Sequence, residues 1–170
     1  RTLHAQCRAG GDALVPDYPD GTPVKQQVLN QLRDNLGAIA KPAYKHDVRR
    51  SEVFGGQEIQ LGRALPATIV VPDSDSVSQY LSCQRIESIM EVTVYAAVRV
   101  VPGSALWRES IEFLLADIRK AVNADMQLSG KATYVDLVDE DLPELVDSNV
   151  AVGQVHLSVA YRHDFDNPNQ

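Results

Sequence analysis

The residues of this chain that come closest to a chemical site are two histidines near its C-terminal end. His156 lies among the polar residues of an alternating segment. His163 is followed by Asp164 and Asp166, so a metal site or an acid–base pair could be drawn there. A metal site needs three or four groups that converge on one ion at about 2 Å. Because residues of opposite parity in a strand point to opposite faces, His156 and His163 are predicted to lie on opposite faces of a sheet, which argues against a shared site.

The other reactive residue types are scattered along the chain. Cys83 follows Ser82, but the residues around them do not form the glycine-flanked elbow of a hydrolase nucleophile. Cys7 and Cys83 are too few for a zinc site or a disulfide framework. We expect both to be reduced thiols of a cytoplasmic setting, with a disulfide across a subunit contact as the alternative. His4 and His46 have no companions at useful spacing, so we predict no catalytic residue, no bound metal and no cofactor.

A strongly acidic segment lies between residues 136 and 147. Six carboxylates occur in it without any Lys or Arg, namely Asp136, Asp139, Glu140, Asp141, Glu144 and Asp147. The whole chain has 16 basic and 23 acidic residues, which gives a formal charge of −7. Since DNA-binding proteins gain affinity by neutralising phosphates with Lys and Arg, this charge argues against a protein that grips nucleic acid.

We interpret the acidic segment as an acidic edge between two strands. It is either a solvated loop that helps solubility, or an acidic rim that repels DNA phosphates or docks a basic partner. A calcium site fits less well, because the segment lacks the glycine and the regularly alternating carboxylates of known cation-binding loops.

Two segments that could position these side chains alternate strictly between apolar and polar residues, as strands with one buried face do. The first has apolar residues at every even position, which are Met90, Val92, Val94, Ala96, Val98 and Val100. The second runs from Val155 to Tyr161. Strands that are buried on both faces have continuous apolar runs instead. The alternation therefore indicates an antiparallel or mixed sheet that helices cover on one side only.

Two further segments have the spacing of amphipathic helices. One begins at Thr22-Pro23, a capping residue followed by proline at the first helical position, and its apolar stripe extends to Ile39. The other follows the break at Pro102-Gly103, where Ser104 is expected to accept from an amide two or three residues on. Its apolar stripe consists of Trp107, Ile111, Leu114, Leu115, Ile118 and Val122.

These elements predict an α+β fold, with a mostly antiparallel or mixed β-sheet and two main amphipathic helices packed on one face. Further strands are expected at Asp47–Phe54, Leu65–Val71 and Thr133–Val138. The length suits a single domain over residues 1–170, with an irregular N-terminal segment at 1–20. No run of about 18 apolar residues and no recognisable signal peptide occur, so we expect no membrane span. The chain begins at Arg1 and not at a methionine, so removal of a leader peptide is kept as an alternative.

Two connections are expected to contact partners. The first is a glycine-rich segment that can form a projecting hairpin, with Phe54, Gly55, Gly56, Gln57, Glu58 and Arg63 as contact residues. An ordinary surface loop is the alternative. The second is the polar stretch Val71–Ser78, which we interpret as a mobile part of a long connection that reaches Ser88 and becomes ordered on assembly.

The order of motifs in the second half of the chain resembles that of a known group of proteins. A helix with the sequence DIRKAV at 117–122 is followed by DMQLSG at 125–130, and the last strand ends in VAYR at 159–162 before DNP at 166–168. In this order, over about the last eighty residues, the chain resembles the tail terminator proteins of tailed bacteriophages, also called tail completion or U-type minor tail proteins. The long connection after Val71 departs from a minimal version of that pattern.

The resemblance implies a structural virion protein at the head-proximal end of the phage tail, assembled in the host cytoplasm. Such a subunit forms a hexameric ring on the finished tail tube, stops its polymerisation, and offers a surface to the head-side connector or neck protein. DNA passes through the ring without specific binding, so an acidic or neutral lining is expected. We assign Asp139, Glu140, Asp141 and Glu144 to the lumen or to a ring face.

Two other functions remain open at this point. The protein could be another head–tail joining subunit, such as a neck or head-completion protein, which would contact the portal side. It could also be a small cytoplasmic enzyme or ligand-binding domain. In that case a pocket on the exposed sheet face would be lined by Tyr95, Arg99, His156 and Arg162.

Overall fold

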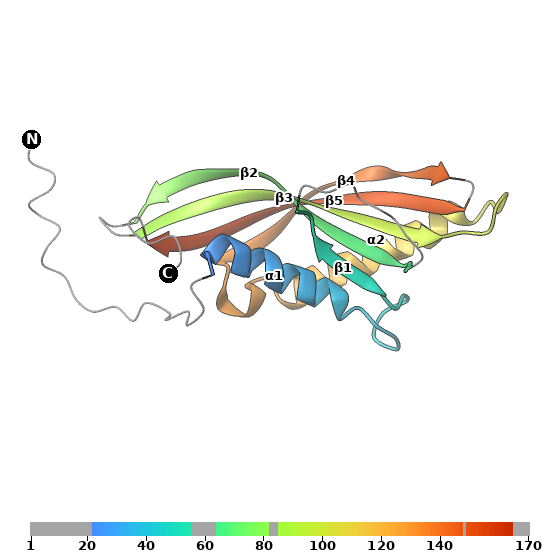
Figure 1. The fold of residues 1–170 in the computed structure, drawn as a ribbon, viewed down its shortest axis with the longest axis horizontal. Coiled ribbons are helices and arrows are strands. Elements are labelled where there is room, and N and C mark those ends of the chain that lie inside the picture. The colour runs from blue at the N-terminus through green and yellow to red at the C-terminus, as the bar shows by residue number, and fades with distance from the viewer. Residues whose placement is uncertain (1–21, 56–63, 82–84, 148, 165–170) are drawn as a thin grey trace, which may run out of the picture.

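The computed structural model describes residues 22–55, 64–81, 85–147 and 149–164 (Figure 1). Two helices and five strands form the fold, with one short 3-10 turn at Leu128–Gly130. Their bounds are α1 Val24–Gly37, β1 Arg50–Val53, β2 Ala67–Tyr80, β3 Arg85–Arg99, α2 Trp107–Ala124, β4 Tyr134–Asp147 and β5 Val150–Asp164. Among these residues, no helix is long and apolar enough to cross a bilayer.

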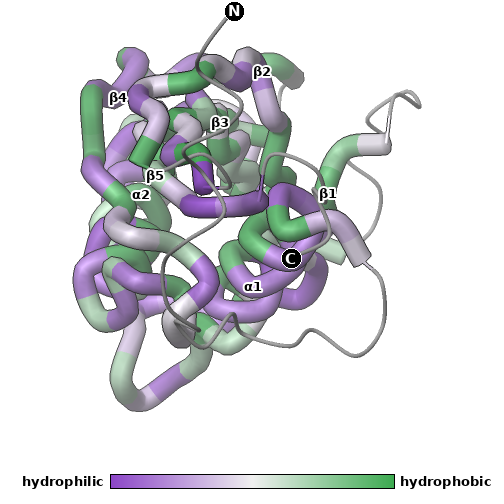
Figure 2. The backbone as a smooth tube through the Cα atoms, turned by 90° about the vertical axis from the view of Figure 1, so that its left-hand side faces the viewer, coloured by the Kyte–Doolittle hydropathy of each residue, from purple (hydrophilic) through white to green (hydrophobic). Residues whose placement is uncertain are grey.

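The strands form one mixed sheet in the order β1-β2-β3-β5-β4. β1 pairs with β2 in parallel, and all other neighbours are antiparallel. The sheet is strongly twisted, and both helices lie on the same side of it (Figure 1). α1 contacts β1, β2 and β5, whereas α2 contacts β3, β4 and β5. Figure 2 shows β1 and β4 at opposite sides of the molecule. The predicted α+β fold with a mixed sheet and two covering helices is confirmed.

The core lies between the sheet and the two helices, as the alternation predicts. Across the central pair of strands, Met90 faces Val159, Val92 faces Leu157, and Val94 faces Val155. All six of these side chains are buried. The helices contribute a second set of buried side chains: Leu32, Leu36, Ile111, Leu114 and Ile118. Truncating one such leucine to alanine typically costs about 2–5 kcal/mol, so this layer fixes how both helices lie on the sheet.

Both helices begin later than expected. Pro23 takes the cap position of α1 instead of the first helical position, without a side-chain cap hydrogen bond, and the backbone oxygen of Thr22 accepts from Gln27 Nε2 at 2.6 Å. Ser104 Oγ does accept from an amide two residues on, Leu106 N at 3.2 Å. However, α2 begins only at Trp107, so Ser104 stabilises the turn before the helix and does not cap it.

The interpretation of Val71–Ser78 as part of a long mobile connection is wrong. These residues belong to β2, which pairs antiparallel with β3 as far as Tyr80 and Ile86. The pairing has irregularities between Pro72 and Ser74 and again near Val77. Beyond the short β1, this half of β2 lies at the edge of the described sheet and is exposed on both faces. Backbone hydrogen bonds to β3 therefore hold a stretch whose side chains show no alternation.

The alternative that the acidic segment is a solvated loop is also wrong. It forms all of β4 after Tyr134 and Val135, and β4 is the other edge strand of the described sheet, paired with β5 through Asp147. The register shifts between Leu137 and Asp139, again before Glu144, and again before Asp147. Such bulges and an internal proline, Pro143, are tolerated at a sheet edge because one side of the strand has no neighbour to pair with.

Candidate functional site

The four carboxylates assigned to a lumen or ring face do not share one face of the sheet. Residues that pair across neighbouring strands lie on the same face, and Asp139 pairs with His156 while Asp141 pairs with Gln154. Glu144 pairs with Val152, on the same side. These three carboxylates are exposed on the face opposite the helices, which we call the open face. Together they form an acidic row along one sheet edge.

Glu140 lies on the other side of β4. It pairs with the buried Val155, and its Oε1 lies 3.2 Å from Arg119 Nε of α2. Oε1 is buried and has no partner of hydrogen-bond geometry in the described part of the chain. The ion pair with Arg119 is thus the contact that offsets its charge, which makes Glu140 a link between β4 and α2 instead of a member of the acidic row.

The acidic row joins a chain of polar contacts across the open face. Thr93 Oγ1 donates a short hydrogen bond to Asp73 and lies 3.0 Å from His156 Nδ1. His156 Nε2 lies 3.4 Å from Asp141 Oδ2. The four residues come from β2, β3, β5 and β4, so the contacts cross most of the sheet. Sequence reasoning missed this arrangement because it depends on strand order and register.

This set has the residue types of a hydroxyl–imidazole–carboxylate triad, but not its proton arrangement. In a triad the hydroxyl gives its proton to the imidazole. Here the Thr93 hydroxyl donates its single proton to Asp73 and not to His156 Nδ1. Thr93 is only 3% exposed, which also keeps substrates from its oxygen. The contacts therefore favour a structural network that holds the open face together.

The predicted pocket of Tyr95, Arg99, His156 and Arg162 does not form one site. Arg99 pairs with Val150 at one end of β5, whereas Arg162 lies near the other end and donates to Glu87 Oε2 at 3.0 Å. At about 3.3 Å per residue, positions 150 and 162 are separated by about 40 Å. Side chains this far apart cannot line one small-molecule pocket.

His156 and His163 lie on opposite faces, as predicted. His163 points to the helix side, where its Nε2 lies 3.0 Å from Ser88 Oγ and its ring stacks on Tyr161 at 5.6 Å between centroids. Burial, together with the hydrogen bond to Asp75 at 2.8 Å, raises the pKa of the Tyr161 hydroxyl well above its ordinary value. Asp75 in turn pairs with Lys25 of α1 at 3.2 Å. Among the described residues, no cluster of three possible metal ligands occurs.

An arginine-lined groove lies at the opposite edge of the sheet, between the end of α1 and β1. Its volume is about 410 Å³, and it is lined by Arg33, Asp34, Gly37, Ala38, Val48, Arg49, Arg50 and Ser51. We call it the arginine groove. Sequence reasoning missed it, because Arg33 and Arg49 meet only when α1 packs beside β1.

Asp117 of α2 holds the segment that leads into this groove. It is 5% exposed, and its carboxylate accepts from the backbone of Lys45 at 3.0 Å and from that of His46 at 2.9 Å. His46 Nδ1 adds a contact at 3.0 Å. A sequence signal for this role exists, since Asp117 interrupts the apolar residues Leu114 and Ile118 on the buried side of the helix.

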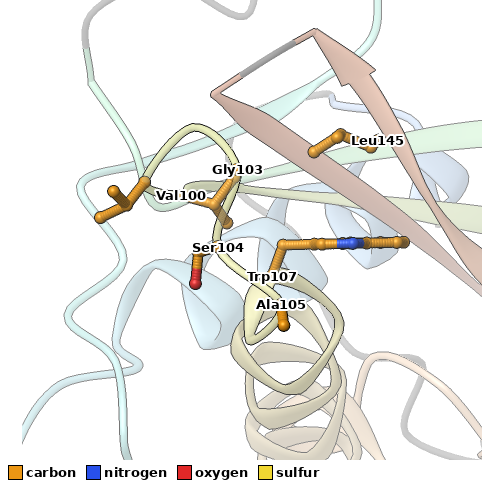
Figure 3. Close-up of a pocket in the computed structure, with 7 residues that line it drawn as sticks. Val100, Gly103, Ser104, Ala105, Trp107 and Leu145 are labelled. Atoms are coloured by element: carbon orange, nitrogen blue, oxygen red, sulfur yellow. The ribbon is translucent and has the colours of Figure 1, made fainter.

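A second pocket, of about 240 Å³, lies at the start of α2 (Figure 3). Figure 3 shows the Trp107 ring below Leu145 of β4, beside Gly103 and Ser104 of the preceding loop. Val100, Val101 and Ala105 complete its lining. Because Val101 and Leu106 are largely exposed beside it, this end of the molecule presents apolar surface.

Only part of the predicted partner-contact loop can be placed. Phe54 follows β1, and its backbone N donates to Val70 O at 2.8 Å. Gly55 is exposed. Gly56, Gln57, Glu58 and Arg63 lie outside the described residues, as do Cys7, Cys83 and the segment 1–20.

Comparison with known proteins finds no family model that matches this sequence and no curated protein similar enough to count as a relative.

Proposed function

We propose that this chain is a tail-terminator-like structural subunit, which forms a ring at the head-proximal end of a phage tail tube. The observation that supports it is the difference between the two ends of the sheet. β4 presents the acidic row at one end, and β1 borders the arginine groove at the other. A ring built by rotation needs two different patches on each subunit, so that one patch meets the other on the neighbour.

The charge of the open face suits a protein that surrounds passing DNA. Asp139, Asp141 and Glu144 are exposed there, and the chain as a whole has a formal charge of −7. Carboxylates that face a channel repel phosphates and do not hold them, which favours passage over binding. We therefore keep these three residues as the lumen or ring-face candidates and leave out Glu140, which contacts α2.

Apolar side chains near the edge strand supply a surface for other proteins. Leu142 is 84% exposed, and Val138 and Val146 of the same strand are more than half exposed. Val101 and Leu106 add to them at the start of α2. Exposed apolar groups that gather in one region mark protein contacts more often than isolated ones do. The tail tube and the head-side connector are the partners that the proposal assigns to this region.

The test is to add the purified chain to tail tube protein while tubes are growing. A terminator arrests growth and appears at one end of each tube in electron micrographs. A chain that binds filled heads and ignores tubes would instead be a neck or head-completion subunit. Tubes that grow to the same length with and without the chain, at any ratio, contradict the proposal.

A further inference from the structure

We infer that the arginine groove of one copy binds the acidic row of the next copy, so that subunits join head to tail. This inference rests on the proposed ring, and it names the contact that closes it. The partner is a second copy of this chain. Three features support the contact: the charge of the groove, the charge of the edge strand, and the places that the fold gives them.

The groove offers cations in a concave site. Arg33 Nη2 lies 2.7 Å from Asp34 Oδ1, and Arg50 Nε lies 2.6 Å from Glu52 Oε1. Arg49 has no carboxylate partner among the described residues and is exposed. The lining has Arg33, Arg49 and Arg50 against Asp34, and Glu52 pairs with Arg50, so the groove keeps a positive charge after these pairs are formed. A planar guanidinium in such a site binds carboxylates through paired hydrogen bonds.

The edge strand offers the matching anions, and this contact places them on the face between neighbouring subunits instead of in the lumen. Residues 136–147 contain six carboxylates and no basic residue, and Asp139, Asp141 and Glu144 project from one face. Addition of a neighbour's strand by backbone pairing is disfavoured, because β4 has repeated register shifts and contains Pro143. The contact is therefore made by side chains. The arginines of the groove bind the carboxylates of β4 in the next copy.

The fold places these patches where a head-to-tail contact needs them. β1 and β4 are the outermost strands of the sheet order, and Figure 2 shows them at opposite sides of the molecule. A subunit whose groove is filled by one neighbour thus keeps its acidic row available for another neighbour. Such a contact is heterologous and can close a ring. A phosphate group of nucleic acid is the competing occupant of the groove.

The experiment uses charge reversal on each side of the contact. The groove variant has Arg33→Glu and Arg49→Glu, and the strand variant has Asp141→Arg and Glu144→Arg. Each is compared with the wild-type chain by native mass spectrometry and sedimentation at low salt. The matched control reverses two exposed residues of α2, Arg108→Glu and Glu112→Arg. Circular dichroism and thermal unfolding establish that each variant is folded before its assembly is measured.

Wild type and control are expected to form the same oligomer, and each variant alone is expected to be monomeric. An equimolar mixture of the two variants is expected to restore assembly, because the reversed groove accepts the reversed strand and the two unreversed patches still fit. The restored oligomers contain equal numbers of both variants in alternation, which only an even-membered ring allows. Raising salt from about 50 to 500 mM dissociates wild type, because exposed ion pairs are screened.

Four results would overturn the inference. One is wild-type protein that stays monomeric at about 1 mM, the concentration at which even a weak specific contact is half-occupied. Another is a pair of folded variants that assemble as wild type does. The third is a mixture of the two variants that does not recover assembly. The fourth is a groove whose reversal abolishes binding of a DNA duplex without changing assembly. If rings form through this contact but do not cap tubes, the inference stands and the proposed function fails. If rings cap tubes but ignore the reversals, the proposed function stands and the inference fails.

Discussion

His46 Nδ1 lies 3.0 Å from Asp117 Oδ2, and the backbone N of His46 donates to the same oxygen at 2.9 Å. The buried carboxylate of α2 thereby fixes the segment that runs from the end of α1 to β1. This segment continues into Arg49 and Arg50, which line the arginine groove. The shape of the groove is therefore tied to a helix that does not itself line it.

The first prediction concerns this carboxylate. Asp117→Ala removes the acceptor of two backbone N–H groups and of the His46 ring. Leaving a buried donor unsatisfied costs about 1–3 kcal/mol, so we expect the free energy of unfolding to fall by about 2–4 kcal/mol in a urea titration. Glu112→Ala, an exposed change on the same helix, is expected to stay within about 0.5 kcal/mol of wild type. Equal stabilities for the two variants would contradict this role of Asp117.

The second prediction concerns Gly153 of β5, which lies against Leu115 and Ile111 of α2. A Cβ atom there would lie 3.0 Å from Leu115 Cδ1 and 3.2 Å from Ile111 Cγ1. Overpacking of a core costs about 1–3 kcal/mol, so Gly153→Val should lower the melting temperature clearly and Gly153→Ala less. Gly55→Ala is the control, since a Cβ atom at Gly55 meets nothing within 4 Å. A Gly153→Val protein that melts like the Gly55→Ala protein would show that α2 can move away without cost.

The third prediction concerns the acid sensitivity of the turn after α2. The backbone N–H of Ser129 donates to Asp125 at 2.9 Å and, with Asn35 Nδ2 at 3.0 Å, holds the pKa of Asp125 below its ordinary value of 3.8. A lowered folded-state pKa means that the stabilisation is complete above about pH 4 and is lost as the pH falls through the folded value.

Asp125→Asn removes this titration. We therefore expect the melting temperature to fall further for wild type than for the variant when the pH is lowered from 7 to 3. At pH 7 the variant should be slightly less stable, because its amide oxygen accepts these hydrogen bonds more weakly than a carboxylate does. Parallel melting curves across this pH range would show that Asp125 does not contribute to acid unfolding.

The fourth prediction separates the two sides of β4. Neutralising the acidic row with Asp139→Asn, Asp141→Asn and Glu144→Gln is expected to slow DNA ejection or to impair head–tail joining. Glu140→Gln affects the contact with Arg119 and should leave both processes as in wild type. Phage infectivity and the rate of DNA release measure the difference. Unchanged infectivity of the triple variant would remove these residues from the lumen or ring face.

The central strands were predictable from sequence because the face of each that meets the helices is apolar and buried. Alternation from Met90 to Val100 reports that burial directly, and β3 and β5 pair over their whole lengths. The two edges were not predictable in the same way. In the distal half of β2 and in β4 many side chains are exposed on both faces, so no alternation marks them as strands. Their backbone pairing with β3 and β5 fixes them instead, and that pairing depends on distant parts of the chain.

The candidate site was predictable only in its composition. The carboxylates between residues 136 and 147 are evident in the sequence, but the register of β4 decides that Glu140 faces α2. A bulge after Leu137 determines which carboxylates share a face, and no local residue pattern specifies it. The arginine groove combines Arg33 with Arg49, and only the packing of α1 beside β1 brings them together.

The most direct test of the ring is to image purified tail tubes with the chain bound and to count its copies at each end by cryo-electron microscopy. We predict a closed ring of identical subunits at the head-proximal end only, with β4 of each copy against the α1–β1 side of the next. A single copy at the tube end, copies distributed along the tube, or a ring joined through other surfaces would contradict this prediction.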